Sequence, residues 1–282
     1  MGKQSFQQDW QTVIRGYAYH TVNDIGIFTL PALSRIEGIS HGFSARTGGV
    51  STGCFSSLNL SFSRPDDPEK IRQNFRLFAE AAGFDDASMV MDNYAHGTVV
   101  RQVDAADCGR GWTKDPLPSC DGLITDDPAV TLVTGHADCM AFFCCDPAHR
   151  AIGLAHAGWR GALGRIGGNL VDAMVDAFHA DPLQMIAGVG PSICQNCFEV
   201  GEDVAAQFEQ AFAGIPCVRP GKPGKAHVDL WMVAASQFME RGVQPGKFNL
   251  MGVCTAEESQ RLYSHRRDKG QTGGMAAFLR LI

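Results

Sequence analysis

The amino-acid sequence predicts an α/β (α+β) fold, a single layered domain of mixed β-sheets flanked by helices. Two short apolar runs, Met140–Cys145 and Ala151–Ala155, are bounded by turn residues and are typical of buried strands. The segment Pro68–Gly83 has the apolar periodicity of an amphipathic helix, with Pro in its first turn and Gly at its end. Strands and helices alternate irregularly along the chain, which favours a mixed sheet.

The composition limits the kinds of molecule that the protein is expected to bind. The chain has 282 residues, 45% of them hydrophobic, and a formal net charge of −6. No cluster of Lys or Arg dominates, so neither nucleic acid nor an anionic membrane is a predicted partner. No apolar run approaches the roughly 20 residues that span a bilayer, and the N-terminus lacks the apolar core of a signal peptide. We therefore expect a cytoplasmic protein.

We predict two regions along the chain. Residues 1–24 form a polar N-terminal segment that we expect to be loosely ordered, and residues 25–282 form one catalytic domain. Gly2 lies in a sequence that resembles a myristoylation site, a match that is common by chance.

The ten cysteines are predicted to be reduced thiols, most of them packed in the core, because no secretory signal precedes them. Cys194 and Cys197 form a C-x-x-C pair. A second pair that would complete a four-cysteine zinc site is not evident, and the pair does not begin a helix as a thioredoxin-like motif does. We predict a structural role for this pair.

The two apolar runs identify a candidate site. If they pair as a hairpin with its turn at residues 146–150, Cys139 and His156 come together at the open end. A thiol and an imidazole in that position form a metal site, a Cys–His nucleophile pair, or two buried residues without chemistry.

Three further segments contribute candidate ligand contacts. Arg46 and Asn59 lie in a Gly-, Ser- and Thr-rich loop, where they contact a ligand or satisfy the loop's own carbonyls. Arg160 begins a predicted helix of about twenty residues ending at Ala180, and the helix start beside it is a natural anion site. Arg266 lies in a basic, Gly-rich loop near the C-terminus.

Several motifs occur in an order that resembles a known family. They are HGFSARTGGVS, His96-Gly97, CDGLIT, ADC, HAGWRG, FEVG after GPSIC, and SHRRDKGQTGG. On these motifs the chain resembles the YfiH family, the bacterial laccase-domain or polyphenol oxidase family, over about residues 40–282. The resemblance implies a layered α/β domain and one zinc ion bound by His96, Cys139 and His156.

The resemblance also implies an activity. Family members phosphorolyse adenosine, inosine, guanosine and methylthioadenosine, a transferase reaction, and also deaminate adenosine, a hydrolase reaction. The implied partners are a purine nucleoside and phosphate. Two positions depart from the family pattern: Tyr94 replaces a Gln, and Gly274 replaces an Arg. Either change could alter substrate preference or rate, and neither is a proposed ligand.

The implied site has a consistent chemistry. Three protein ligands leave a fourth position open, which marks a catalytic zinc site. We assign the three ligands and Asp138 to the catalytic residues. Asp138 acts as a proton carrier or as a partner of the ligand Cys139. The alternative is that Asp138 satisfies backbone N–H groups. We expect substrate contacts from five residues, of which the arginines bind phosphate or pair with carboxylates: Ser44, Arg46, Asn59, Arg160 and Arg266.

Two other enzyme classes compete with this interpretation. Copper outcompetes zinc at most N/S ligand sets, so copper loading in vitro is expected, and a copper-dependent polyphenol oxidase is one alternative. The chain has nine His and no H-x-H pair, which disfavours a multicopper oxidase. The other alternative is a metal-free cysteine hydrolase that uses Cys139 and His156.

Overall fold

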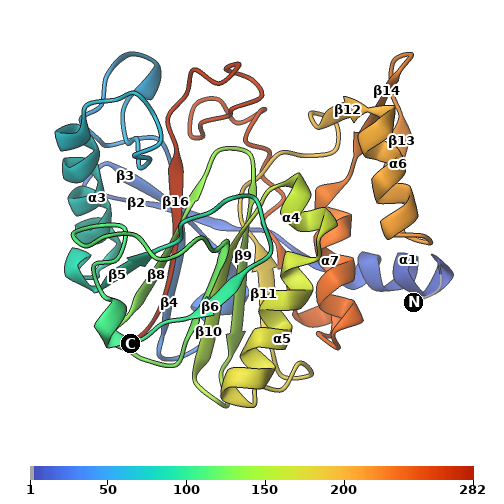
Figure 1. Cartoon of the computed structure of the whole chain (residues 1–282), viewed down its shortest axis with the longest axis horizontal. Helices are drawn as coiled ribbons and strands as arrows, with labels where there is room; N and C mark the ends of the chain where they lie inside the picture. The colour runs from blue at the N-terminus through green and yellow to red at the C-terminus, as the bar shows by residue number, and fades with distance from the viewer. Residues whose placement is uncertain (1–2) are drawn as a thin grey trace.

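The computed structural model describes residues 3–282 and confirms the predicted fold class (Figure 1). A seven-stranded mixed sheet has the strand order β1 (Ile14–Arg15), β15 (Phe248–Leu250), β11 (Ile186–Val189), β9 (Met140–Asp146), β10 (Ala151–Ala157), β7 (Gly122–Thr125) and β6 (Val100–Gln102). A six-stranded mixed sheet has the order β2 (Ala18–Val22), β3 (Ile25–Thr29), β4 (Ile39–Ser44), β16 (Met275–Leu281), β8 (Thr131–His136) and β5 (Met89–Met91). A small antiparallel sheet contains β12 (Glu199–Gly201), β14 (Lys225–Val228) and β13 (Val218–Pro220).

The two large sheets pack against each other, and helices cover their outer faces. Helix α3 (Pro68–Ala82) covers the six-stranded sheet, while α5 (Ile166–Phe178) and α7 (Leu230–Glu240) cover the seven-stranded sheet (Figure 1). The remaining helices are α1 (Lys3–Thr12), α2 (Pro31–Ser34), α4 (Trp159–Leu163) and α6 (Glu202–Ala211).

Strand β9 has a hydrophobic layer on each of its two faces, one between its sheet and the helices and one between the two large sheets. Cys144 packs in the layer beneath the helices, whereas its neighbour Cys145 packs between the sheets. Successive side chains of a strand point to opposite faces, so a strand with core on both sides is apolar throughout. This explains why the sequence of β9 shows no polar alternation.

The predicted hairpin is confirmed. Strands β9 and β10 pair antiparallel with Ala141 opposite His156 and Met140 opposite Ala157. Cys139 directly precedes β9, so the hairpin places it next to His156 at the open end. Helix α3 is also confirmed: Asp67 caps its N-terminus by accepting from the Glu69 N–H, and Gly83 ends it at φ 76°.

The expectation of one long helix after His156 is wrong. Helix α4 has five residues, and Arg165 adopts a left-handed conformation at φ 66° before α5 begins. The Arg165 guanidinium forms an ion pair with Glu240 and donates to the carbonyl of Ala211, contacts that fix the break. A helix of a single turn does not make the anion site that was expected of a long one.

The N-terminal segment also differs from expectation, because residues 3–24 are attached to the domain. Helix α1 buries Phe6 completely in the core beneath the seven-stranded sheet. Strand β1 pairs with β15, and β2 pairs with β3. The polar composition conceals these contacts, since β1 and β2 are edge strands with exposed side chains. Gly2 lies outside the described residues. None of the described helices has the length and apolar character needed to cross a membrane.

Candidate functional site

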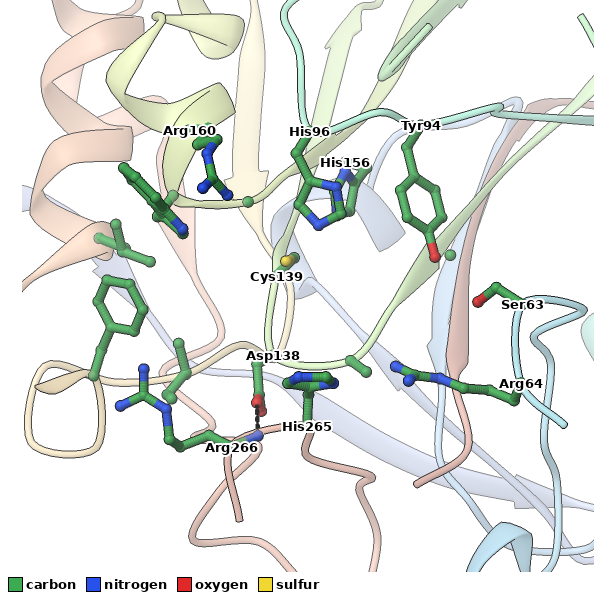
Figure 2. Close-up of a pocket in the computed structure, with 17 residues that line it drawn as sticks. Ser63, Arg64, Tyr94, His96, Asp138, Cys139, His156, Arg160, His265 and Arg266 are labelled. Carbon is green, nitrogen blue, oxygen red and sulfur yellow. Dashed lines mark hydrogen bonds between the residues drawn. The ribbon is translucent and has the colours of Figure 1, made fainter. Parts of the chain in front are cut away.

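A cavity of about 540 Å³ lies at the open end of the β9–β10 hairpin. Its lining comes from the ends of β8 and β10, from the start of α4, and from loops around residues 63, 95 and 265. Figure 2 shows these segments surrounding a common space, with Cys139 at its centre. The volume falls in the range of small-molecule sites.

His96, Cys139 and His156 form a cluster in this cavity. Their donor atoms all lie within 4.8 Å of one another, and the two imidazole rings are nearly perpendicular, with centroids 5.0 Å apart (Figure 2). His156 is buried in β10, Cys139 is half-buried, and His96 is exposed in a loop where it adopts φ 59°. Two imidazoles and a thiol suit zinc.

Asp121 fixes both histidines and was not identified from the sequence. Its Oδ1 lies 3.1 Å from Nδ1 of His156, and its Oδ2 accepts from the N–H groups of Gly97 and Ala95, which flank His96. Carboxylates commonly orient metal-binding histidines in this way. The signal was its place directly before β7, the strand beside β10.

The pKa values show how strongly the buried groups interact. Burial acts to lower the pKa of His156, but the Cys139 thiolate and the Asp121 carboxylate outweigh it and raise that pKa to about 10. Burial acts to raise the pKa of Cys139, but His156 and His96 outweigh it and lower that pKa to about 7. Without a metal, the pair therefore has substantial thiolate–imidazolium character at neutral pH.

Arginines occupy the other walls of the cavity. Arg160 lies at the start of α4 with its guanidinium 4.3 Å from the Trp159 ring centroid. Arg266 also lines the cavity, and its Nη1 donates to the carbonyls of Cys197 and Glu199. Both side chains line the cavity, and their contact with substrate stays a prediction.

Sequence reasoning missed Arg64 and His265, which line the same cavity (Figure 2). Among the described residues, the buried Nε of Arg64 has no hydrogen-bond partner. His265 stands inside the SHRRDKGQTGG motif, and Arg64 follows the Gly- and Ser-rich loop directly, so both were close to recognised signals.

Asp138 lines the cavity and anchors a loop. Its Oδ1 accepts from the Thr255 hydroxyl and its Oδ2 from the Arg266 N–H, each at 2.6 Å. This arrangement matches the alternative role considered for Asp138, that of satisfying a backbone N–H. Asp138 thereby positions the segment that carries Arg266.

Ser44, Arg46 and Asn59, which we expected to contact substrate, lie outside the cavity lining, and their contact with substrate stays a prediction. Ser44 accepts from the Ala276 N–H, and Asn59 accepts from the Gly274 N–H. Arg46 donates to the Ser56 carbonyl and lies over the Tyr263 ring. Arg46 and Asn59 satisfy backbone groups around an irregular loop, and Ser44 at the end of β4 satisfies an N–H at the start of β16.

The two residues that depart from the family pattern, Tyr94 and Gly274, lie in different surroundings. Tyr94 lines the cavity, and its ring lies 4.4 Å from the His156 ring, centroid to centroid. Gly274 is tightly packed: a Cβ there would lie 2.6 Å from Cβ of Ser61. Tyr94 is therefore the departure that reaches the site directly.

The expectation that the C-x-x-C pair lacks partner ligands is wrong. Cys254 and Glu257 join Cys194 and Cys197, and the four donor atoms lie within 4.8 Å of one another. The partners come from a segment about sixty positions away, a proximity that the sequence pattern does not reveal.

Fold and site together define an α/β protein whose hairpin end carries a His–Cys–His centre beside a cavity with several arginines. The chain belongs to the family described as multi-copper polyphenol oxidoreductase laccase, whose model matches residues 40–282. Relatives and solved structures named YfiH and YlmD place it in the YfiH-type family.

Several relatives share the name of one activity. A purine nucleoside phosphorylase from Deinococcus radiodurans is 39% identical over 243 residues, covering 86% of this chain and 89% of the relative. Purine nucleoside phosphorylase YfiH from Escherichia coli is 30% identical over 258 residues, covering 90% and 98%. The crystal structure of YlmD from Geobacillus stearothermophilus matches with a TM-score of 0.86 at 30% identity, covering 93% of this chain and 97% of that one.

Proposed function

We propose that the protein is a zinc-dependent purine nucleoside phosphorylase that acts on adenosine, inosine, guanosine and methylthioadenosine. The observation that carries the proposal is that a His–Cys–His ligand set and several arginines share one cavity of nucleoside size. The activity printed in the names of the relatives supports the same reaction.

The donor chemistry fits a zinc ion at His96, Cys139 and His156. The ligands are two imidazoles and one thiol, and the second nitrogen of His156 faces a carboxylate, as in many zinc sites. Zinc bound there supplies a Lewis acid with an open coordination position. Copper binds the same ligand types, so copper loading in vitro is expected.

The arginines of the cavity account for the binding of phosphate. In phosphorolysis a phosphate oxygen forms a bond to the ribose C1′, and the bond from C1′ to the purine nitrogen breaks with its electron pair moving to the base, which takes up the proton that the phosphate loses. Arg160, Arg64 and Arg266 can hold the phosphate, because guanidinium groups bind phosphate oxygens in bidentate fashion. The products are the free base and ribose 1-phosphate.

A second reaction, deamination of adenosine, is proposed at the same site because the ligand set is open. Deamination consumes water and needs no phosphate. Adenosine is therefore incubated with and without phosphate, and the products are separated by chromatography. Adenine formed only with phosphate supports phosphorolysis, and inosine formed in both conditions supports deamination.

Two other results would replace the proposal. If neither product forms and a phenol is oxidised only with added copper, the polyphenol oxidase alternative holds. Activity retained in rigorously metal-free protein would favour a cysteine hydrolase that uses the Cys139–His156 pair. We further propose a cytoplasmic location, where the ten thiols remain reduced.

A further inference from the structure

A second cluster of metal-ligating side chains lies beside the cavity. The thiols of Cys194, Cys197 and Cys254 and a carboxylate oxygen of Glu257 lie within 4.8 Å of one another. Two short segments contribute them, one with the pattern C-x-x-C and the other with the pattern C-x-x-E. Each segment thus presents two donors at the spacing found in structural zinc sites.

Backbone hydrogen bonds bring these two segments together. Strands β11 and β15 pair in parallel, so their carboxyl ends lie at the same edge of the sheet. The pairing continues beyond the strands through Ser192, whose N–H donates to the Val253 carbonyl and whose carbonyl accepts from the Thr255 N–H. Cys254 lies between Val253 and Thr255 in this pairing, and Cys194 is two residues beyond Ser192, so the backbone preorganises the site.

The donors are turned toward one another. Oε1 of Glu257 lies 3.6 Å from Sγ of Cys194 and 3.5 Å from Sγ of Cys197. Cys194 and Cys254 are buried, at 8% and 6% exposure. Among the ion pairs of the described residues, none joins a Lys or Arg to Glu257. A dication would complement this concentration of sulfur and carboxylate.

We infer that Cys194, Cys197, Cys254 and Glu257 form a second metal site, a structural zinc site. Four protein donors suffice to complete the coordination of a structural zinc ion, in contrast to the three-ligand set of the cavity. Three thiolates favour zinc over calcium, magnesium or manganese, which prefer oxygen ligands.

The ion at this site holds one wall of the cavity. The carbonyl of Cys197 accepts from Nη1 of Arg266, and the Ile193 N–H donates to the Asp138 carbonyl. Thr255, next to Cys254, donates its hydroxyl to Asp138. The loop segments that carry the second site therefore also position Arg266, and loss of this metal should loosen that wall.

Counting zinc by native mass spectrometry tests the inference. The count is made in a His156→Ala background, which lacks a ligand of the first site. Any zinc that remains then reports on the second site, whether or not the proposed function is correct. In this background we expect one zinc per chain, and none after Cys197→Ser is added. Cys108→Ser, which changes a thiol that belongs to neither cluster, is the matched control and should leave the count unchanged.

Glu257→Gln tests the site without disturbing the core, because this side chain is exposed. We expect a chelator to remove zinc at least about tenfold faster from this variant, since loss of even an outer partner costs a metal site that much. Cobalt-substituted wild-type protein should show strong thiolate-to-cobalt charge-transfer absorption, and Cys197→Ser should weaken it.

Two outcomes would overturn the inference. The first is the absence of zinc from the His156→Ala protein purified under reducing conditions with zinc present. The second is an intact mass showing that two of the three cysteines form a disulfide in the freshly purified protein. Either result would leave the cluster as a set of packed thiols.

Discussion

The two metal-type clusters of this protein are built in opposite ways. The first joins His96, Cys139 and His156 at the end of a hairpin and opens into a cavity. The second joins three cysteines and Glu257 where two loop segments follow parallel strands. Three ligands with an open position suit chemistry on a bound substrate, whereas four ligands close the metal off.

The comparison teaches that ligand number and surroundings, more than the presence of cysteine, separate a reactive site from a structural one. Asp121 supports the first cluster through a hydrogen bond to His156. The second cluster has its support in backbone hydrogen bonds between the two loop segments. Substitutions in the first cluster should therefore mainly lower activity, and substitutions in the second should mainly lower stability.

The largest expected effect is the loss of activity on removing a ligand of the first cluster. His156→Ala should lower kcat/KM for phosphorolysis about a thousandfold or more, because Lewis-acid stabilisation contributes about 4 kcal/mol or more to such reactions. Cys197→Ser should instead lower the melting temperature, with a much smaller loss of kcat/KM that comes from the loosened wall carrying Arg266. Steady-state kinetics and thermal unfolding of both variants measure the contrast. Equal losses of activity would break the comparison.

Asp121→Asn should weaken zinc binding at the first cluster by about 10–100-fold, the usual cost of removing a carboxylate that orients a ligand. Competition with a chromogenic chelator measures the affinity. Asp126→Asn, an exposed acid just beyond the other end of β7, is the matched control and should leave it unchanged. If Asp121→Asn retains wild-type affinity, the carboxylate only satisfies the backbone of the Ala95–Gly97 loop.

Arg160→Ala should raise the KM for phosphate by about 10–100-fold, because a hydrogen bond to a charged group is worth about 1.5–3 kcal/mol. Deamination of adenosine, which uses no phosphate, should slow far less. Arg46→Ala removes an arginine that lies outside the cavity and should leave the phosphate KM unchanged. Unchanged phosphate dependence in Arg160→Ala would remove this residue from the site.

Local patterns predicted the parts of the fold that depend on local contacts. The hairpin of β9 and β10 was predictable because short apolar runs flank a turn, and α3 because its capping residues and apolar face lie in one segment. The attachment of α1 was not, since it depends on Phe6 entering a core built by distant strands. The break at Arg165 was also hidden, because it rests on contacts with Glu240 and Ala211.

The difference between local and long-range contacts also explains which site residues could be predicted from the sequence. Cys139 and His156 were brought together by the hairpin alone, whereas His96 came from the family resemblance. Asp121 and the partners of the C-x-x-C pair depend on neighbouring strands whose order the sequence did not define. Arg46 stays a prediction, because in sequence an arginine that serves a loop backbone, as Arg46 does here, resembles one that serves a ligand.

The smallest effect at neutral pH concerns His41, a buried histidine outside both clusters. Its Nε2 accepts from the Leu30 N–H, which requires a neutral ring, and burial lowers its pKa from 6.5 to about 4. The unfolded chain therefore binds more protons between these pH values, so this stability is present above pH 6.5 and is lost as pH falls toward 4. The loss amounts to about 3 kcal/mol.

His41→Gln keeps an acceptor for the Leu30 N–H but cannot be protonated in this range. The free energy of unfolding of the variant should therefore fall less steeply than that of the wild type between pH 6.5 and 4. Denaturant titrations of metal-free protein measure both slopes, because protons also displace zinc from its ligands and would otherwise add to the effect. Once the pH dependence of the free energy of unfolding is known, the release of metal at low pH can be compared between the two clusters. Identical slopes in variant and wild type would show that His41 is not the group that titrates.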